Sequence, residues 1–208
     1  MCSDADASGI EDGHRDLEAL SREQGELYVG VDVGRHRDLT VVWVVSAQQD
    51  VLTTAAILEL SNAPFQQQFE LLTAVFALPG VCRGAIDASG LGMQLAEQLV
   101  ERFGSDRVAA VTFTTAMKSR LAIDLRIAVE NGTIRIPNDP RVHNDFHAVE
   151  RTVLSSGQFS LTAPRTQAGH ADRFWAAALA VFAARDANGV TQEWEFGAPL
   201  AFAGAGCW

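Results

Sequence analysis

Three aspartates stand where a carboxylate could do chemistry. Asp32 lies inside the alternating apolar stretch ELYVGVDVG, residues 26–34, with a glycine two positions to either side. Asp87 follows the short predicted strand 81–86, and Asp172 lies in the first turn of a long apolar segment. A lone charge buried among apolar residues is costly, so such a carboxylate must be paired, protonated or bound to a metal. We interpret the setting of Asp32 as metal binding.

Clustered carboxylates repel one another, and a divalent cation removes that penalty. Ligands that are all oxygen select Mg²⁺ or Mn²⁺ over zinc. Two such ions roughly 4 Å apart can activate a water and stabilise the leaving oxygen of a phosphodiester. The glycines beside Asp32 and Asp87 would let a phosphate backbone approach the ions closely. We therefore expect two ions of Mg²⁺ or Mn²⁺ at these acids.

Each aspartate also has a simple structural interpretation. Asp32 could accept backbone hydrogen bonds at a strand end, and Asp87 could serve the turn at Ser89-Gly90. Asp172 could be an acid that the helix dipole favours in a first turn. The combination of strand acid, strand-end acid and late-helix acid, in that order along the chain, favours a common site.

The elements that must position these acids indicate an α/β fold. Residues 26–34 alternate, residues 39–45 are almost continuously apolar, and residues 51–60 are a plausible third strand. Short polar turns between them predict an antiparallel three-strand meander. From Pro64 onward strands and helices alternate, which predicts parallel strands with helical crossovers. We expect a mixed central sheet flanked by helices.

Later elements follow from the same periodicities. Helices are expected from Pro64, over 93–103, 115–130 and 139–154, and from His170 to about Asp186, and strands over 81–86, 107–113, 134–136 and 159–162. Within the last helix, Trp175, Ala176, Leu179 and Phe182 recur on the side that carries Asp172. The third acid is therefore predicted to point towards the sheet.

Chain length and net charge limit the number of domains and the class of protein. The 208 residues suit one domain, which we place at 26–187, after a flexible acidic lead at 1–25 and before an irregular tail at 188–208. The net charge of −10 argues against a general nucleic-acid coat, although it is concentrated near the N-terminus. Three scattered cysteines suggest reduced thiols in a cytoplasm, and no segment has the pattern of a membrane span or signal peptide.

Four segments carry a family resemblance: YVGVDVGRHRDLTVVWV, IDASGLGMQLAEQL, FTTAMKSRLAIDLRIAVENGTIRIP and HADRFWAAALA, between Tyr28 and Ala184. In this order they resemble the nuclease domain of phage large terminase subunits, especially the Mu-like type, within the RNase H-like superfamily. The resemblance implies metal-dependent cutting of concatemeric viral DNA during genome packaging, with Asp32, Asp87 and Asp172 as metal-binding catalytic acids. The implied partners are double-stranded DNA, a terminase ATPase motor, a small terminase subunit and a portal. The resemblance also implies that the protein is located in the cytoplasm of a bacterial host and does not bind a membrane.

Further residues match weaker positions of the family. Asp38 could assist the metal or water, and His170 sits where some relatives place a histidine near the metals, although both could simply cap a turn or a helix. Lys118 matches a basic position and could hold a phosphate, or it could be a solvated lysine on a helix face. Arginines close to the motifs are candidate DNA contacts: Arg35, Arg37, Arg120, Arg165 and Arg173.

The resemblance leaves alternatives open. The chain has no G-x-x-x-x-G-K-[ST] segment, so we expect a separated nuclease domain or a truncated product without its motor. Another RNase H-like nuclease, such as a Holliday-junction resolvase or transposase-type enzyme, would share the metal chemistry. The spacing Gly30-x-Asp32-x-Gly34 also resembles the phosphate loop of sugar kinases and actin-like ATPases. A non-catalytic packaging or adaptor module would keep the fold and cut nothing.

Overall fold

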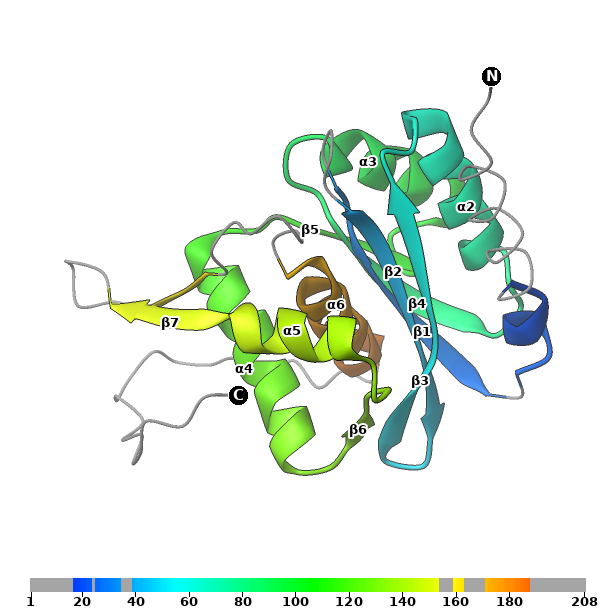
Figure 1. Cartoon of the computed structure of the whole chain (residues 1–208). Helices are drawn as coiled ribbons and strands as arrows, with labels where there is room; N and C mark the ends of the chain where they lie inside the picture. The colour runs from blue at the N-terminus through cyan, green and yellow to red at the C-terminus, as the bar shows by residue number, and fades with distance from the viewer. Residues whose placement is uncertain (1–16, 24, 35–38, 154–158, 163–170, 188–208) are drawn as a thin grey trace, which may run out of the picture.

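The computed structural model describes residues 17–23, 25–34, 39–153, 159–162 and 171–187. A six-stranded sheet in the order β5-β4-β1-β2-β3-β6 forms the centre of the molecule (Figure 1). Its strands are β1 (Glu26–Asp32), β2 (Leu39–Gln48), β3 (Val51–Ser61), β4 (Val81–Asp87), β5 (Val108–Val111) and β6 (Ile134–Arg135). The helices are α2 (Phe65–Phe76), α3 (Gly92–Phe103), α4 (Thr115–Glu130), α5 (Pro140–Ala148) and α6 (Asp172–Ala187).

The sheet is mixed, as the sequence predicted. β1 pairs antiparallel with β2, and β2 antiparallel with β3, which is the expected meander. β4 and β5 continue the sheet parallel to β1, while the short β6 runs parallel to β3 at the opposite edge. The helical crossovers expected after Pro64 are α2 and α3, which connect β3 to β4 and β4 to β5.

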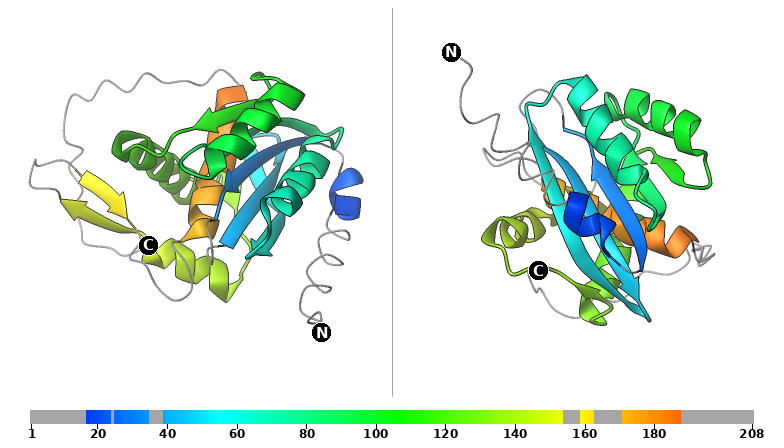
Figure 2. Two further views of the ribbon diagram at one scale, coloured as in Figure 1. Left: turned by 90° about the horizontal axis from the view of Figure 1, so that it is seen from above. Right: turned by 90° about the vertical axis from the view of Figure 1, so that its right-hand side faces the viewer.

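Each face of the sheet has its own hydrophobic core. Leu27, Val29 and Val31 of β1 pack with residues of α2 and α3, and Tyr28 packs on the other face with α4 and α6. This alternation follows from the period of two along a strand. The further views in Figure 2 show the two groups of helices on opposite sides of the sheet.

Helix α6 is the central element of one face. Every residue from Asp172 to Ala184 except Phe182 is buried, because the helix lies between the sheet on one side and α4 and α5 on the other (Figure 1). The sequence predicted one inward face; the structure buries nearly the whole circumference, which explains why alanine is so frequent there. The closest approach is at Gly30, where an added Cβ would lie 2.0 Å from the carbonyl oxygen of Ala176.

One predicted helix is too long. We expected a helix over 139–154, but α5 ends at Ala148 and Val149 is extended, with φ −81° and ψ 108°. Val149 is buried in the core on the α6 side, and the chain continues as β7 (Glu150–Val153), which pairs antiparallel with β8 (Phe159–Thr162). Burial of the β-branched Val149 and strand pairing outweigh the helical periodicity. The strand predicted over 159–162 is confirmed as β8.

The end of the acidic lead is ordered into the fold. Residues 17–21 are helical, and Leu20 is only 2% exposed because it packs into the core on the α2 and α3 side. No helix in the described part of the chain is long and apolar enough to span a membrane.

Candidate active site

Asp32 and Asp87 end neighbouring strands. β1 and β4 are parallel, and their last paired residues are Val31 and Ile86. Asp32 and Asp87 come directly after this pair and are the last residues of their strands, so they occupy adjacent positions at the carboxyl end of the sheet. Neighbouring strands lie about 4.8 Å apart, which places the two backbones next to each other.

Both carboxylates belong to the face that α6 covers. In β1, Tyr28 packs in the α6-side core and Gly30 contacts the α6 backbone, so Asp32, in step with both, shares their face. In β4, Ala85 belongs to the same core and Asp87 comes two residues later. Periodicity thus places both acids on one side of the sheet.

The direction of α6 brings the third acid to the same end. Asp186 near its C-terminus is ion-paired with Arg83 near the start of β4, and Ala176 lies against Gly30 in the middle of β1. α6 therefore runs antiparallel to β1 and β4, as Figure 1 shows. Asp172, one turn before Ala176 on the same helix face, lies beyond Gly30 towards the strand ends.

The three aspartates share an end and a face of the sheet, and all are buried: Asp32 is 9%, Asp87 8% and Asp172 6% exposed. Carboxylate oxygens are the donors that Mg²⁺ and Mn²⁺ prefer, so the chemistry of this donor set fits a hard divalent cation. Within the ranges that the structure describes, no three acidic, histidine or cysteine side chains already form a metal-binding group. The common location, and not a preformed cage, is what the described residues establish.

The loop after β4 orders Asp87. The backbone N–H of Ser89 donates to Asp87 Oδ1 at 2.9 Å, and the Ser89 hydroxyl accepts from the N–H of Phe113 at 2.9 Å. A Cβ at Gly92 would lie 2.0 Å from the Asp87 carbonyl oxygen. Gly30 and Gly92 are thus required by close packing within the protein, which is a reason for glycine at these two positions apart from the room for a phosphate backbone that the sequence led us to expect.

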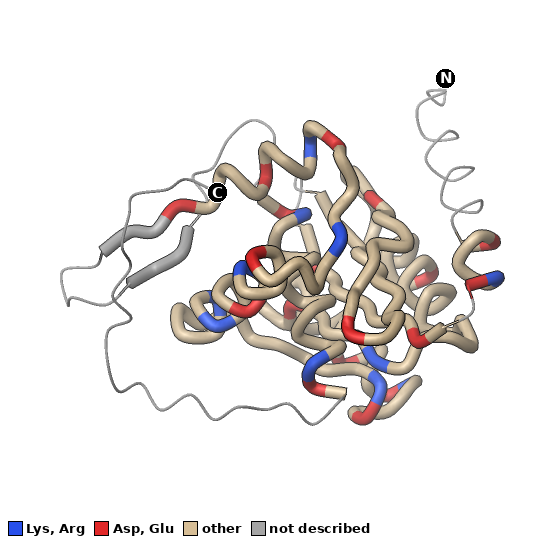
Figure 3. Tube along the Cα trace, turned by 90° about the horizontal axis from the view of Figure 1, so that it is seen from below, with Lys and Arg blue, Asp and Glu red and all other residues tan. Residues whose placement is uncertain are grey.

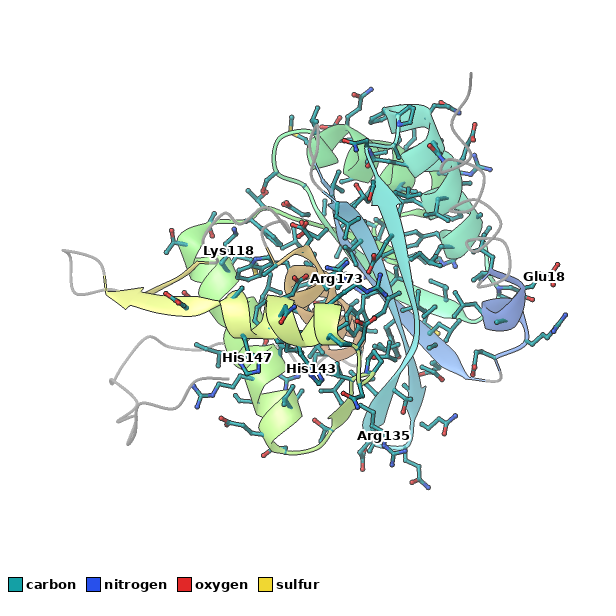
Figure 4. All side chains as sticks on the ribbon, in the orientation of Figure 1. Glu18, Lys118, Arg135, His143, His147 and Arg173 are labelled. Atoms are coloured by element: carbon teal, nitrogen blue, oxygen red, sulfur yellow. The ribbon has the colours of Figure 1, made fainter. Side chains whose placement is uncertain are left out.

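Lys118 lies at the same end of the molecule. Its ammonium nitrogen is 4.9 Å from the ring centre of Trp175, one turn after Asp172, and 5.1 Å from that of Phe113, just beyond β5. Cation–π contacts hold the ammonium over the two rings without neutralising its charge. The half-buried Lys118, labelled in Figure 4, therefore places a positive charge beside the acidic end of the sheet.

Arg173 does not fit the DNA contact expected from the sequence. It is buried, and its guanidinium is ion-paired with Glu59 and Asp145. Burial by itself lowers the pKa of Arg173, but Glu59 and Asp145 outweigh burial and raise it. Burial raises the pKa of the Asp145 carboxyl, against the opposing effect of Arg173. Sequence periodicity gave no sign of this cluster, because Glu59 and Asp145 lie far apart in elements whose pairing no local pattern specifies.

Arg120 is partly engaged within the protein. Its Nε lies 3.9 Å from Asp124 Oδ2, and its guanidinium is 5.5 Å from the ring centre of Phe182. The remaining candidates lie outside the described residues: Arg35, Arg37, Asp38, Arg165 and His170.

Residues 29–184 match the family described as the terminase RNase H-like domain. This match covers three quarters of the chain. The chain belongs to the terminase RNase H-like domain family.

Relatives and solved structures agree with this terminase domain. The Mu-like prophage FluMu protein gp28 of Haemophilus influenzae is 32% identical over 136 residues, which are 64% of this chain and 27% of gp28. The large terminase nuclease of thermophilic phage G20c, crystallised with bound magnesium, has a TM-score of 0.64 and 22% identity over 77% of this chain and 82% of that one. The same nuclease has also been crystallised with cobalt and with zinc.

A longer terminase shows the same fold as one part of its chain. The large terminase of thermophilic bacteriophage D6E, in complex with ATP-γ-S, matches with a TM-score of 0.59 and 11% identity over 78% of this chain and 41% of that one. The terminase domain described here spans about a quarter of the length of gp28. The predicted family and the RNase H-like fold with a mixed sheet are therefore confirmed.

Proposed function

We propose that this terminase domain is a divalent-metal-dependent DNA endonuclease that cuts concatemeric viral DNA during genome packaging. The observation that carries the proposal is the common location of Asp32, Asp87 and Asp172, which are buried at the same end and on the same face of one sheet. Membership of the terminase family supports DNA as the substrate.

The three carboxylates would hold Mg²⁺ or Mn²⁺, most simply as two ions. Bound ions of this kind supply a nucleophilic water at neutral pH and stabilise the leaving oxygen of a phosphodiester. The hydrogen bond from Ser89 to Asp87 Oδ1 keeps that carboxylate in one orientation. The metal-bound crystal forms of the G20c nuclease support the choice of a divalent cation.

Lys118 would hold a phosphate of the DNA backbone. Its ammonium group is fixed over Trp175, on the first turns of the helix that carries Asp172. A contact to phosphate positions the duplex and carries no sequence information, so cutting should tolerate many sequences. Asp38 and His170 would be accessory to the cation, and Arg35, Arg37, Arg120 and Arg165 would be additional DNA contacts.

The partners would be those of a packaging machine. A terminase ATPase motor, a small terminase subunit and a portal, in the cytoplasm of a bacterial host, would supply the DNA and the timing of cutting. The D6E match, in which this fold is 41% of a large terminase crystallised with ATP-γ-S, supports the association with a motor.

The test is plasmid cleavage with Mg²⁺ or Mn²⁺, with and without EDTA, by the wild type and by Asp32→Asn, Asp87→Asn and Asp172→Asn. The expected result is cutting by the wild type that EDTA abolishes, and a loss of about a hundredfold or more in each variant, since each amide replaces a charged ligand. Equal cutting by all four proteins would reject the site. Selective cutting of branched over linear duplex would instead favour a resolvase-type nuclease.

A further inference from the structure

A largely buried ion-pair cluster lies directly beside Asp172. Arg173, the next residue of α6, donates from Nε to Glu59 Oε1 at 2.7 Å and from Nη2 to Glu59 Oε2 at 3.0 Å. This two-pronged pairing with β3 is the strongest geometry available to an arginine and a carboxylate. The Arg173 side chain is only 10% exposed and lies between α5, α6 and the sheet (Figure 4).

Asp145 completes the cluster from α5. Its Oδ2 accepts from the backbone N–H of Arg173 at 3.0 Å and from Arg173 Nη1 at 3.2 Å. The first backbone N–H groups of a helix have no partner within the helix and need an outside acceptor. Asp145 therefore caps the first turn of α6 from a neighbouring helix, as an N-cap side chain does from its own.

The cluster fixes the turn that carries Asp172. Glu59 holds the guanidinium of Arg173 and Asp145 holds both its guanidinium and its backbone, so β3 and α5 restrain the start of α6. Consecutive helix residues point about 100° apart, because the helix has 3.6 residues per turn. With Arg173 held towards β3 and α5, Asp172 is left on the side of β1 and β4.

We propose that Glu59, Arg173 and Asp145 form a clamp that positions Asp172 for cation binding. This inference rests on the proposed function, since it assigns the clamp a purpose only if Asp172 is a ligand. Groups that hold a metal ligand in its orientation matter for binding, and their loss costs about 10- to 100-fold in metal affinity or activity. Ligands also need positions good to about 0.5 Å, which a free first helical turn would not provide.

The test compares clamp variants with a control at the other end of α6. Glu59→Gln and Asp145→Asn keep shape and weaken the clamp, while Arg185→Met removes the pairing of Arg185 Nη1 with Asp124 Oδ1, which is 2.6 Å long. Each protein is titrated with Mn²⁺ by calorimetry, the Mn²⁺ concentration for half-maximal plasmid cutting is measured, and Tm is recorded without metal. The expected result is Mn²⁺ binding and half-maximal cutting shifted at least about tenfold in the clamp variants. Arg185→Met should lower Tm and leave both Mn²⁺ constants unchanged.

The outcomes separate the two proposals. If the wild type neither binds Mn²⁺ nor cuts, the proposed function fails and the clamp fails with it. If the wild type does both and the clamp variants match it, or shift no more than Arg185→Met, the clamp inference alone is overturned. Should Asp145→Asn not fold, Glu59→Gln decides, because Glu59 is only half-buried and its glutamine replacement retains an acceptor.

Discussion

Asp124 shows how a buried aspartate of this protein behaves away from the candidate site. It is 4% exposed in α4, paired with Arg185 and, more distantly, with Arg120. Burial raises the pKa of the Asp124 carboxyl, and the two arginines oppose that rise only in part. A raised pKa means that the folded protein holds this proton more tightly than the unfolded chain does.

The stability of the variant Asp124→Asn relative to the wild type should therefore increase as pH rises. The stabilising contribution of the protonated carboxyl is complete below its ordinary pKa of 3.8 and is lost as pH rises through the higher folded-state pKa. Asparagine resembles the protonated form and does not titrate. Urea unfolding at several pH values from about 3.5 to about 7 should show the free energy of unfolding of the wild type falling relative to that of the variant.

Other titrating groups cancel in this difference, since both proteins contain them. If the free energy of unfolding of the wild type instead rose relative to that of Asp124→Asn over the same pH range, the arginine partners of Asp124 would outweigh burial. The pKa of Asp124 would then be lowered.

At the level of elements, the contact between α6 and β1 leaves no room for a side chain at Gly30. An added Cβ would meet the Ala176 carbonyl oxygen at 2.0 Å and the Ala180 nitrogen at 2.3 Å. Both are backbone atoms, so no side chain can rotate away and the helix itself must move. Gly30→Ala should cost about 3 kcal/mol or more in free energy of unfolding, at the upper end of what overpacking a core costs.

Gly25→Ala is the matched control, because its Cβ would meet only the Ser46 hydroxyl at 3.3 Å and the Ala47 carbonyl oxygen at 3.6 Å. That change should stay within about 0.5 kcal/mol of the wild type. Thermal or urea unfolding of the three proteins measures the difference. Similar stability for both glycine variants would show that α6 can shift on the sheet without cost, and would weaken the argument that it places Asp172.

The elements around the acids were predictable where local periodicity and tertiary contacts agree. Residues 26–34 alternate because one side of β1 meets α2 and α3 and the other meets α6, so the alternation visible in the sequence is the alternation of the fold. The prediction of a helix over 139–154 was wrong where local periodicity and tertiary contacts disagree. Val149 is extended and buried, and the strand that follows it pairs with Phe159–Thr162, further along the chain.

The three candidate acids could be proposed from the sequence, but the ion-pair cluster beside Asp172 could not. Asp87 and Asp172 each stand at an element boundary that a local pattern reveals, and Asp32 is a lone charge inside an alternating strand pattern. Glu59 and Asp145 meet Arg173 across 114 and 28 positions of sequence. Only the packing of three elements brings them together, and the sequence alone predicted a DNA contact for Arg173 from its nearness to the motif that contains Asp172.

For the molecule as a whole, the net acidity must be reconciled with the proposed binding of DNA. The net charge is −10, and Figure 3 shows Lys and Arg interspersed with Asp and Glu along the chain. Long-range attraction to a polyanion is therefore weak, and the proposed DNA binding would depend on a few local cations and on metal ions at the acidic end. The proposed divalent cation would then serve both the binding of DNA and the stability of the folded domain.

Divalent cations should accordingly stabilise the whole molecule. A ligand that binds only the folded state adds about 2.7 kcal/mol at a hundred times its Kd, which for a domain of this size raises Tm by about 5–10 °C. Thermal unfolding with Mn²⁺ should show this rise, EDTA should reverse it, and Asp32→Asn should lose most of it. Asp50→Asn, which changes an exposed acid in the turn between β2 and β3, should keep the full rise. Equal rises in all three proteins would place the stabilising cation somewhere other than the end of the sheet where Asp32, Asp87 and Asp172 lie.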